Sequence, residues 1–134
     1  MNTPATHGVH HIGLAVSDLE ASASFFIQLL GWTKVKRKDD YPAIFVSDGN
    51  IMLTLWATEE KASSFDRRRN VGLHHLALRV ENQSVLMRVY GKLLSAGINV
   101  EFAPTKVNGG PAMHMMCYEP SGVRIEFYWP GNDS

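Results

Sequence analysis

The chain has 134 residues, 45% hydrophobic and 19% charged, with thirteen basic and thirteen acidic side chains. This length suits one domain with its own core, and the balanced charge gives no indication of a nucleic-acid or membrane partner. The single cysteine, Cys117, excludes an internal disulfide framework and favours a cytoplasmic location. We expect no signal peptide in the first ten residues and no membrane-spanning segment.

The first half of the chain begins with an alternating strand, predicted over residues 9–16, which leads into a helix over residues 18–30. Ser17 and Glu20 fit a capping box at the start of this helix. Gly31 lies where a helix C-terminus is expected. Three short strands, separated by turn residues, complete a β-α-β-β-β unit.

The second half repeats this pattern. Residues 10–16 reappear as residues 74–80, and a second helix is predicted over residues 83–95. The strand at residues 51–56 is matched by one at residues 125–129. The difference in residue number between the two closing strands is larger than that between the two opening strands. The second copy therefore carries about ten more residues in its middle.

The repeat defines the expected organisation of the chain. The first module covers about residues 8–57, a polar linker residues 58–71, and the second module about residues 72–130. We therefore predict a single α+β domain made of two tandem βαβββ modules.

Side chains alternate between the two faces of a strand, so the apolar residues of each strand identify the face that packs on the core. In the first strand, Ile12, Leu14 and Val16 form the apolar set, which leaves His11 on the other face. The same argument puts His75 and Glu126 on the non-core faces of their strands. Two imidazoles and a carboxylate with open positions suit Fe(II), Mn, Co, Ni or Zn.

Other residues share the expected non-core face. His114 lies between the apolar residues Met113 and Met115, and is either an acid/base group or a hydrogen-bonded pocket histidine. Arg79 and Arg124 are either anion-binding groups or solvent-exposed strand ends. The full set of expected lining residues beside His114 is Met52, Trp56, Arg79, Met116, Tyr118, Arg124 and Tyr128.

Three other features are interpreted as structural rather than functional. His10 and His74 precede the expected ligands and should point the other way, as edge or core-rim histidines. The run of three arginines that begins at Arg67 is interpreted as part of a solvated loop rather than a phosphate site. Cys117 lies in an apolar run and is interpreted as a small core residue.

These motifs carry a family resemblance. Residues 11–20, 74–80 and 119–126 resemble the vicinal oxygen chelate superfamily, and the resemblance spans about residues 9–130. That group includes glyoxalase I, methylmalonyl-CoA epimerase, fosfomycin-resistance enzymes, bleomycin-resistance binders and extradiol dioxygenases. The resemblance implies a curved mixed sheet around a central cup, one divalent metal ion and a homodimer. The implied ligand positions are His11, Met52, His75 and Glu126.

The departures from the family pattern narrow the expected activities. Met52 stands where glyoxalase I has a glutamate, and a thioether is a poor ligand for the metals considered above. Ala15 and Trp56 replace the family's glutathione-contacting residues, which argues against lactoylglutathione lyase activity. Gly13 replaces a threonine of the fosfomycin enzymes, which argues against fosfomycin modification.

The leading interpretation is a metal-dependent enzyme of lyase or isomerase type that acts on a small oxygenated substrate. Glu126 or His114 would transfer protons in this reaction. One alternative is an Fe(II) extradiol-type dioxygenase, in which His114 and either Tyr118 or Tyr128 would correspond to the accessory histidine and tyrosine of that class. Another is a metal-free small-molecule binder of the bleomycin-resistance type, with aromatic residues such as Trp56 and Trp129 stacking on the ligand.

Overall fold

A computed structural model describes residues 2–132 of the chain. The structure divides into two compact units at the boundary between Glu60 and Lys61, and each unit is described by itself. Both are built from one β-α-β-β-β sequence of elements around a four-stranded mixed sheet. The predicted α+β fold class is therefore confirmed.

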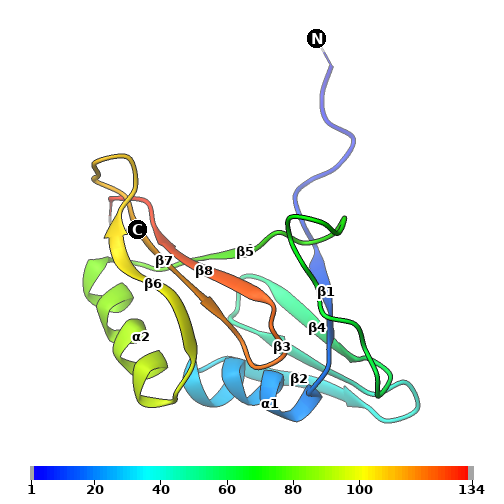
Figure 1. The fold of residues 1–134 in the computed structure, drawn as a ribbon. Coiled ribbons are helices and arrows are strands. Elements are labelled where there is room, and N and C mark those ends of the chain that lie inside the picture. The colour runs from blue at the N-terminus through cyan, green and yellow to red at the C-terminus, as the bar shows by residue number, and fades with distance from the viewer. Residues whose placement is uncertain (1, 133–134) are drawn as a thin grey trace. The chain divides into compact units, whose positions relative to one another are not determined.

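The first unit contains strand β1, a helix in two parts, and three further strands (Figure 1). The strand order is β1-β4-β3-β2, in which β1 pairs with β4 in parallel and the other pairs are antiparallel. The parallel pair needs a crossover, which the helix provides. The elements are β1 (His11–Val16), α1 (Leu19–Ser24), η1 (Phe25–Leu29), β2 (Thr33–Lys38), β3 (Ala43–Ser47) and β4 (Met52–Ala57).

The second unit repeats this topology with the strand order β5-β8-β7-β6. Here β5 and β8 are parallel and the remaining pairs are antiparallel. Helix α2 packs against β6, β7 and β8, and Figure 1 shows it alongside β6. The elements are β5 (Leu76–Arg79), α2 (Gln83–Ser95), β6 (Asn99–Lys106), β7 (Met113–Tyr118) and β8 (Arg124–Trp129).

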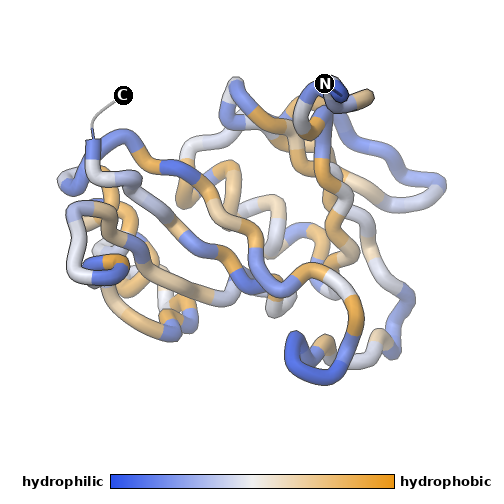
Figure 2. The backbone as a smooth tube through the Cα atoms, turned by 90° about the horizontal axis from the view of Figure 1, so that it is seen from above, coloured by the Kyte–Doolittle hydropathy of each residue, from blue (hydrophilic) through white to orange (hydrophobic). Residues whose placement is uncertain are grey.

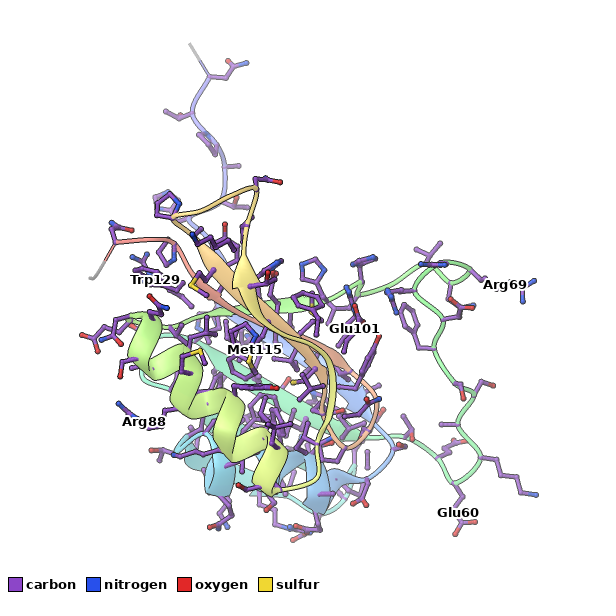
Figure 3. The ribbon with its side chains drawn as sticks, turned by 60° about the vertical axis from the view of Figure 1, so that its left-hand side comes forward. Glu60, Arg69, Arg88, Glu101, Met115 and Trp129 are labelled. Carbon is purple, nitrogen blue, oxygen red and sulfur yellow. The ribbon has the colours of Figure 1, made fainter. Side chains whose placement is uncertain are left out.

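Each sheet packs its helix against one face, as the alternation predicts. Hydrophobic and hydrophilic residues are interspersed along the backbone (Figure 2). In the second unit, Met115, Cys117 and Ile125 are fully buried, and Met115 lies on the helix side of the sheet in Figure 3. Burial raises the pKa of the Cys117 thiol to about 12, so this cysteine is an unreactive core residue, as predicted.

The helix boundaries correct one prediction. The N-cap of α1 is Asp18, whose carboxylate accepts a hydrogen bond from the Ala21 amide, and not Ser17. The carboxylate reaches the third residue beyond it, which is the geometry of a helix N-cap. Gly31 and Gly97 follow the two helices with φ of +77° and +72°, as expected for helix C-termini.

The strand and helix lengths differ modestly from the predictions. Strand β5 begins at Leu76 rather than at residue 73, so His75 lies immediately before the strand. The first helix ends in a five-residue π-helical segment, η1, whereas α2 matches its predicted range. Within residues 2–132, no helix is long and apolar enough to span a membrane.

Candidate functional site

The candidate site of the second unit lies on the face of its sheet opposite the buried core residues. Strands β7 and β8 pair His114 with Tyr128, Met116 with Glu126, and Tyr118 with Arg124. Directly paired residues of an antiparallel ladder point to the same side, so these six residues share one face. Five of the lining residues predicted from the sequence are thus brought together around Glu126.

Glu126 is the centre of this group. Its side chain is buried, with 7% relative exposure, although it carries a carboxylate. One oxygen, Oε1, lies 3.2 Å from Nε2 of His75, and the other, Oε2, lies 2.5 Å from Nδ1 of His114. A buried carboxylate requires such partners, because an unpaired charge is costly away from water. Both imidazoles therefore converge on one acid.

The geometry at His114 favours a hydrogen-bonded pocket histidine, the second of the two interpretations from the sequence. Its Nδ1 is hydrogen-bonded to Glu126. Its ring also contacts Phe102, with centroids 4.9 Å apart, and Tyr128, with centroids 6.1 Å apart. The ring is held by strand β6 on one side and β8 on the other. This fixed ring with a carboxylate on Nδ1 is also a suitable arrangement for proton transfer through Nε2.

The donor set fits a divalent metal only in part. His75 and Glu126 supply a nitrogen and an oxygen that face each other, and these atom types suit the borderline metals expected above. Within residues 2–132, however, no group of three or more His, Cys, Asp or Glu side chains is arranged to hold a metal ion. His11, the third predicted ligand, belongs to the first unit, so its role as a ligand stays a prediction.

In the first unit, the predicted site residues lie on one face of the sheet. His11 and Met52 are register partners on β1 and β4. A side chain at Gly13 would meet Thr54 at 3.2 Å, and the Thr54 hydroxyl accepts a hydrogen bond of 2.8 Å from Nε1 of Trp56. The absence of a side chain at Gly13 therefore makes room for this Thr54–Trp56 pair.

Trp56 is the centre of an aromatic group in the first unit. The rings of Tyr41 and Phe45 lie 5.0 Å and 5.8 Å from it, and the Lys38 ammonium lies 5.3 Å from its ring. The exposed face of this sheet is therefore aromatic and cationic where the corresponding face of the second sheet is acidic and imidazole-rich.

Arg124 and Tyr118 are engaged by a residue that the sequence analysis did not identify, Glu101. Arg124 makes two hydrogen bonds to the Glu101 carboxylate, of 2.9 Å and 2.8 Å, and the Tyr118 hydroxyl donates a third, of 2.5 Å. The pKa of Glu101 is lowered to about 2, first by the Arg124 hydrogen bonds and then by that of Tyr118, against the effect of burial. Arg124 is thus neither a free anion-binding group nor a solvent-exposed strand end.

Arg67 joins the same cluster from the loop before β5. Its guanidinium donates a hydrogen bond of 3.0 Å to the Tyr118 hydroxyl and lies 3.7 Å from Glu101. The interpretation of the arginine run as a solvated loop is therefore wrong for Arg67. Figure 3 shows Glu101 on the sheet and Arg69 on the loop, further out.

Glu101 reaches this face because of a β-bulge. The register of β6 against β7 shifts between Val100 and Phe102, so that Val100 pairs with Cys117 and Phe102 with Met116. The extra residue at such a bulge is Glu101, and a bulge changes the direction of a side chain. Strict alternation along β6 gives no signal for this contact, which explains why the sequence analysis missed it.

His74 does not behave as an independent edge histidine. Its Nδ1 lies 2.8 Å from Nδ1 of His75 and 3.5 Å from Nη1 of Arg124. The pKa of His74 is lowered, first by desolvation and then by the neighbouring His75 and Arg124, which disfavour an added positive charge. His10 makes the same contact with His11 in the first unit, at 2.9 Å.

Two further residues of the predicted site, Arg79 and Met116, complete the face of the second sheet. Arg79 is exposed and pairs in register with Tyr128, at the far end of β5 and β8. Met116 is buried, with 4% exposure, directly opposite Glu126. The immediate surroundings of Glu126 are therefore apolar at Met116 and polar at His75 and His114.

A fold of paired βαβββ units with a His/Glu centre defines a class of protein, and the comparisons with known proteins agree. Residues 8–127 match the model of the glyoxalase/bleomycin resistance protein/dioxygenase superfamily. Since the match covers most of the chain, the protein belongs to this superfamily.

Individual relatives are similar over nearly the whole chain. The protein YqjT of Bacillus subtilis (strain 168), described as uncharacterized, is 30% identical over 91% of this chain and 98% of its own length. Catechol-2,3-dioxygenase of the same organism is 27% identical over 91% of this chain, which spans 42% of that enzyme. A domain of this superfamily from Frankia sp. EAN1pec is similar in structure, with a TM-score of 0.82, 22% identity, and coverage of 94% and 99% of the two chains.

Proposed function

We propose that the protein is a metal-dependent enzyme of this superfamily that acts on a small oxygenated substrate by lyase or isomerase chemistry. The observation that carries the proposal is the buried Glu126 carboxylate, which holds an imidazole against each of its oxygens. His75 and Glu126 would hold the metal, with His11 as the third ligand implied by the family pattern. We expect a cytoplasmic homodimer with a small-molecule substrate.

The bound metal would supply a Lewis acid that stabilises negative charge on the substrate's oxygens. The chain's own groups would carry the proton. His114 is held by Glu126 through Nδ1 and by the rings of Phe102 and Tyr128, so its Nε2 is the atom that would exchange a proton with the substrate. Met116 beside Glu126 would exclude water from the acid.

An Fe(II) extradiol dioxygenase is the second candidate, and a specific observation favours it. The 27% identity to a catechol-2,3-dioxygenase covers 91% of this chain. Two histidines and one carboxylate are also the ligand set of non-haem Fe(II) oxygenases. The third candidate, a metal-free binding protein, would use the aromatic group around Trp56 in place of the Glu126 centre.

The test is metal content of tag-free protein purified without a chelator, for the wild type beside Glu126→Gln and His11→Ala. We expect about one metal ion per chain in the wild type and a loss in both variants. Iron would favour the dioxygenase, and catechols would then be assayed under oxygen. Nickel, cobalt, manganese or zinc would favour the lyase or isomerase, and substrates of those classes would be assayed. Little metal in the wild type, even after each metal is added back, would overturn the proposal in favour of a binding protein.

A further inference from the structure

The exposed face of the first sheet carries three aromatic side chains that remain partly open to water. They are Trp56 on β4, Phe45 on β3 and Tyr41 in the turn before β3. The ring centroids of Tyr41 and Phe45 lie 5.0 Å and 5.8 Å from that of Trp56. Tyr41 is 59% exposed, and the other two are half-buried. Such a group suits a further aromatic ring, which gains both burial and edge-to-face contacts.

Trp56 is held in place within this group. Its Nε1 donates a hydrogen bond of 2.8 Å to the hydroxyl of Thr54, which is buried. The neighbouring strand β1 places only Gly13 and Ala15 beside these two residues, and both are exposed. These small residues leave the sheet uncovered next to the indole. An indole that is already ordered also loses little conformational freedom when a ligand binds.

Two lysines of β2 add positive charge to the same face. Lys36 pairs in register with Phe45. Lys38 pairs with Ala43, the register partner of Trp56. The Lys38 ammonium lies 5.3 Å from the Trp56 ring, and the Lys36 ammonium lies 5.9 Å from the Phe45 ring. An ammonium beside a ring face still has N–H donors available for an anion, because it has three of them.

These lysines have no carboxylate partner in the part of the chain that the structure describes, since neither forms an ion pair there. The exposed Asp40 is influenced by Lys38: backbone hydrogen bonds and then Lys38 lower its pKa, but the two side chains form no ion pair. In the second unit, by contrast, Arg124 is engaged by Glu101. The cations of the first unit are therefore available to an anion from outside the chain.

We propose that this face binds an aromatic carboxylate, with its ring against Trp56 and Tyr41 and its carboxylate on Lys38. Lys36 adds a second positive charge on the same side. The inference rests on the proposed function for its purpose, because it names the substrate class of that enzyme. His11, a proposed metal ligand, lies on the same face of the same sheet. An uncharged ring would leave the lysines without a partner, and an aliphatic acid would leave the aromatic surface unused.

Binding can be measured on the metal-free protein with 4-fluorobenzoate as the probe. Its ¹⁹F signal reports on the ligand, and the indole N–H signal of Trp56, assigned with Trp56→Phe, reports on the site. We expect saturable shifts with a Kd of about 1–10 mM, the range for a ligand with so few atoms. 4-Fluorobenzyl alcohol, which lacks the charge, should bind about fivefold more weakly. Equal binding of the acid and the alcohol would overturn the inference, as would the absence of any shift with the acid.

Variants of β2 and of the turn after it locate the site. Lys38→Met should weaken binding of the probe about fivefold, and Tyr41→Ala about threefold. Lys34→Met is the matched control, because Lys34 lies on the same strand but pairs in register with the core residue Val46. This control should leave the Kd unchanged. An equal effect of Lys34→Met and Lys38→Met would show that only net charge matters and would overturn the inference.

The outcome is independent of the metal-content measurement. Wild-type protein that holds a metal ion but shows no shift with 4-fluorobenzoate would overturn the aromatic-carboxylate inference and leave the proposed function standing. Saturable shifts in a protein that takes up no metal would instead support the ligand class and overturn the metal-dependent function.

Discussion

The two units share one topology but differ in the chemistry of their exposed sheet faces. Strands β4 and β8 are repeat-mates, and the position of Glu126 on β8 is held by Met52 on β4. On this face the first unit has an aromatic group around Trp56, whereas the second unit has two imidazoles around Glu126 and an ion-pair cluster. The backbone pattern depends only on the alternation and turns, so the same fold tolerates two different faces.

The largest effects are expected in the cores, which should be equivalent in the two units. Leu53 and its repeat-mate Phe127 are almost completely buried, with 0% and 3% exposure. Leu53→Ala should lower the free energy of unfolding by roughly 2–5 kcal/mol, and Phe127→Ala by roughly 3–5 kcal/mol. Urea unfolding measures both, with Met87→Ala on the exposed side of α2 as control. Losses below about 1 kcal/mol would contradict the assignment of these positions to the cores.

The second prediction separates the two faces by metal affinity. His75→Ala should weaken Co²⁺ binding by at least about 100-fold, because the variant removes a nitrogen that faces Glu126. Met52→Leu should leave the affinity unchanged, since a thioether contributes little to such a site. Chelator competition measures both, and equal weakening in the two variants would show that the first unit supplies a ligand through Met52.

The third prediction concerns pH and the Glu101 cluster. The pKa of Glu101 in the folded protein is about 2, below its ordinary value of 4.5. The folded state is therefore favoured when Glu101 is ionised, and this stabilisation is present above pH 4.5 and disappears as the pH falls toward 2.

Glu101→Gln should therefore cost about 1–2 kcal/mol at pH 7, a figure reduced for the partial exposure of the side chain, and much less at pH 3. Urea unfolding at both pH values provides the measurement. Glu20→Gln in the first unit is the control, because its ion pair with Arg37 is largely exposed and should contribute nothing measurable. A cost for Glu101→Gln that does not depend on pH would rule out the ion pair as its source.

The smallest effects are expected at the helix N-termini. Asp18 caps α1 and Asn82 caps α2, each through a side-chain oxygen that accepts an amide hydrogen. Asp18→Ala and Asn82→Ala should each cost about 1 kcal/mol. Ser17→Ala should be close to neutral in thermal unfolding, since Ser17 does not occupy the N-cap, and a larger loss there than at Asp18 would restore the capping box predicted from the sequence.

The sequence by itself determined the features that depend on short-range pattern. The repeat predicted two βαβββ modules, and alternation predicted the buried positions Met115, Cys117, Ile125 and Phe127 of β7 and β8. It did not predict that Met116 and Glu126, on the other face, are buried as well. The range of α2 and the glycines that follow both helices were also predicted correctly. These features follow from backbone geometry and from the burial of apolar side chains. Both depend on residues that are close together in the sequence.

Tertiary structure alone decided the contacts of the charged groups around the site. A bulge in β6 brings Glu101 to Arg124, and a loop residue far along the chain, Arg67, reaches Tyr118. Neither contact has a sequence period, because a bulge breaks the alternation of a strand and a loop has none. The contact between Arg124 and His74 is of the same kind, because the fold and not the local sequence puts these two residues side by side.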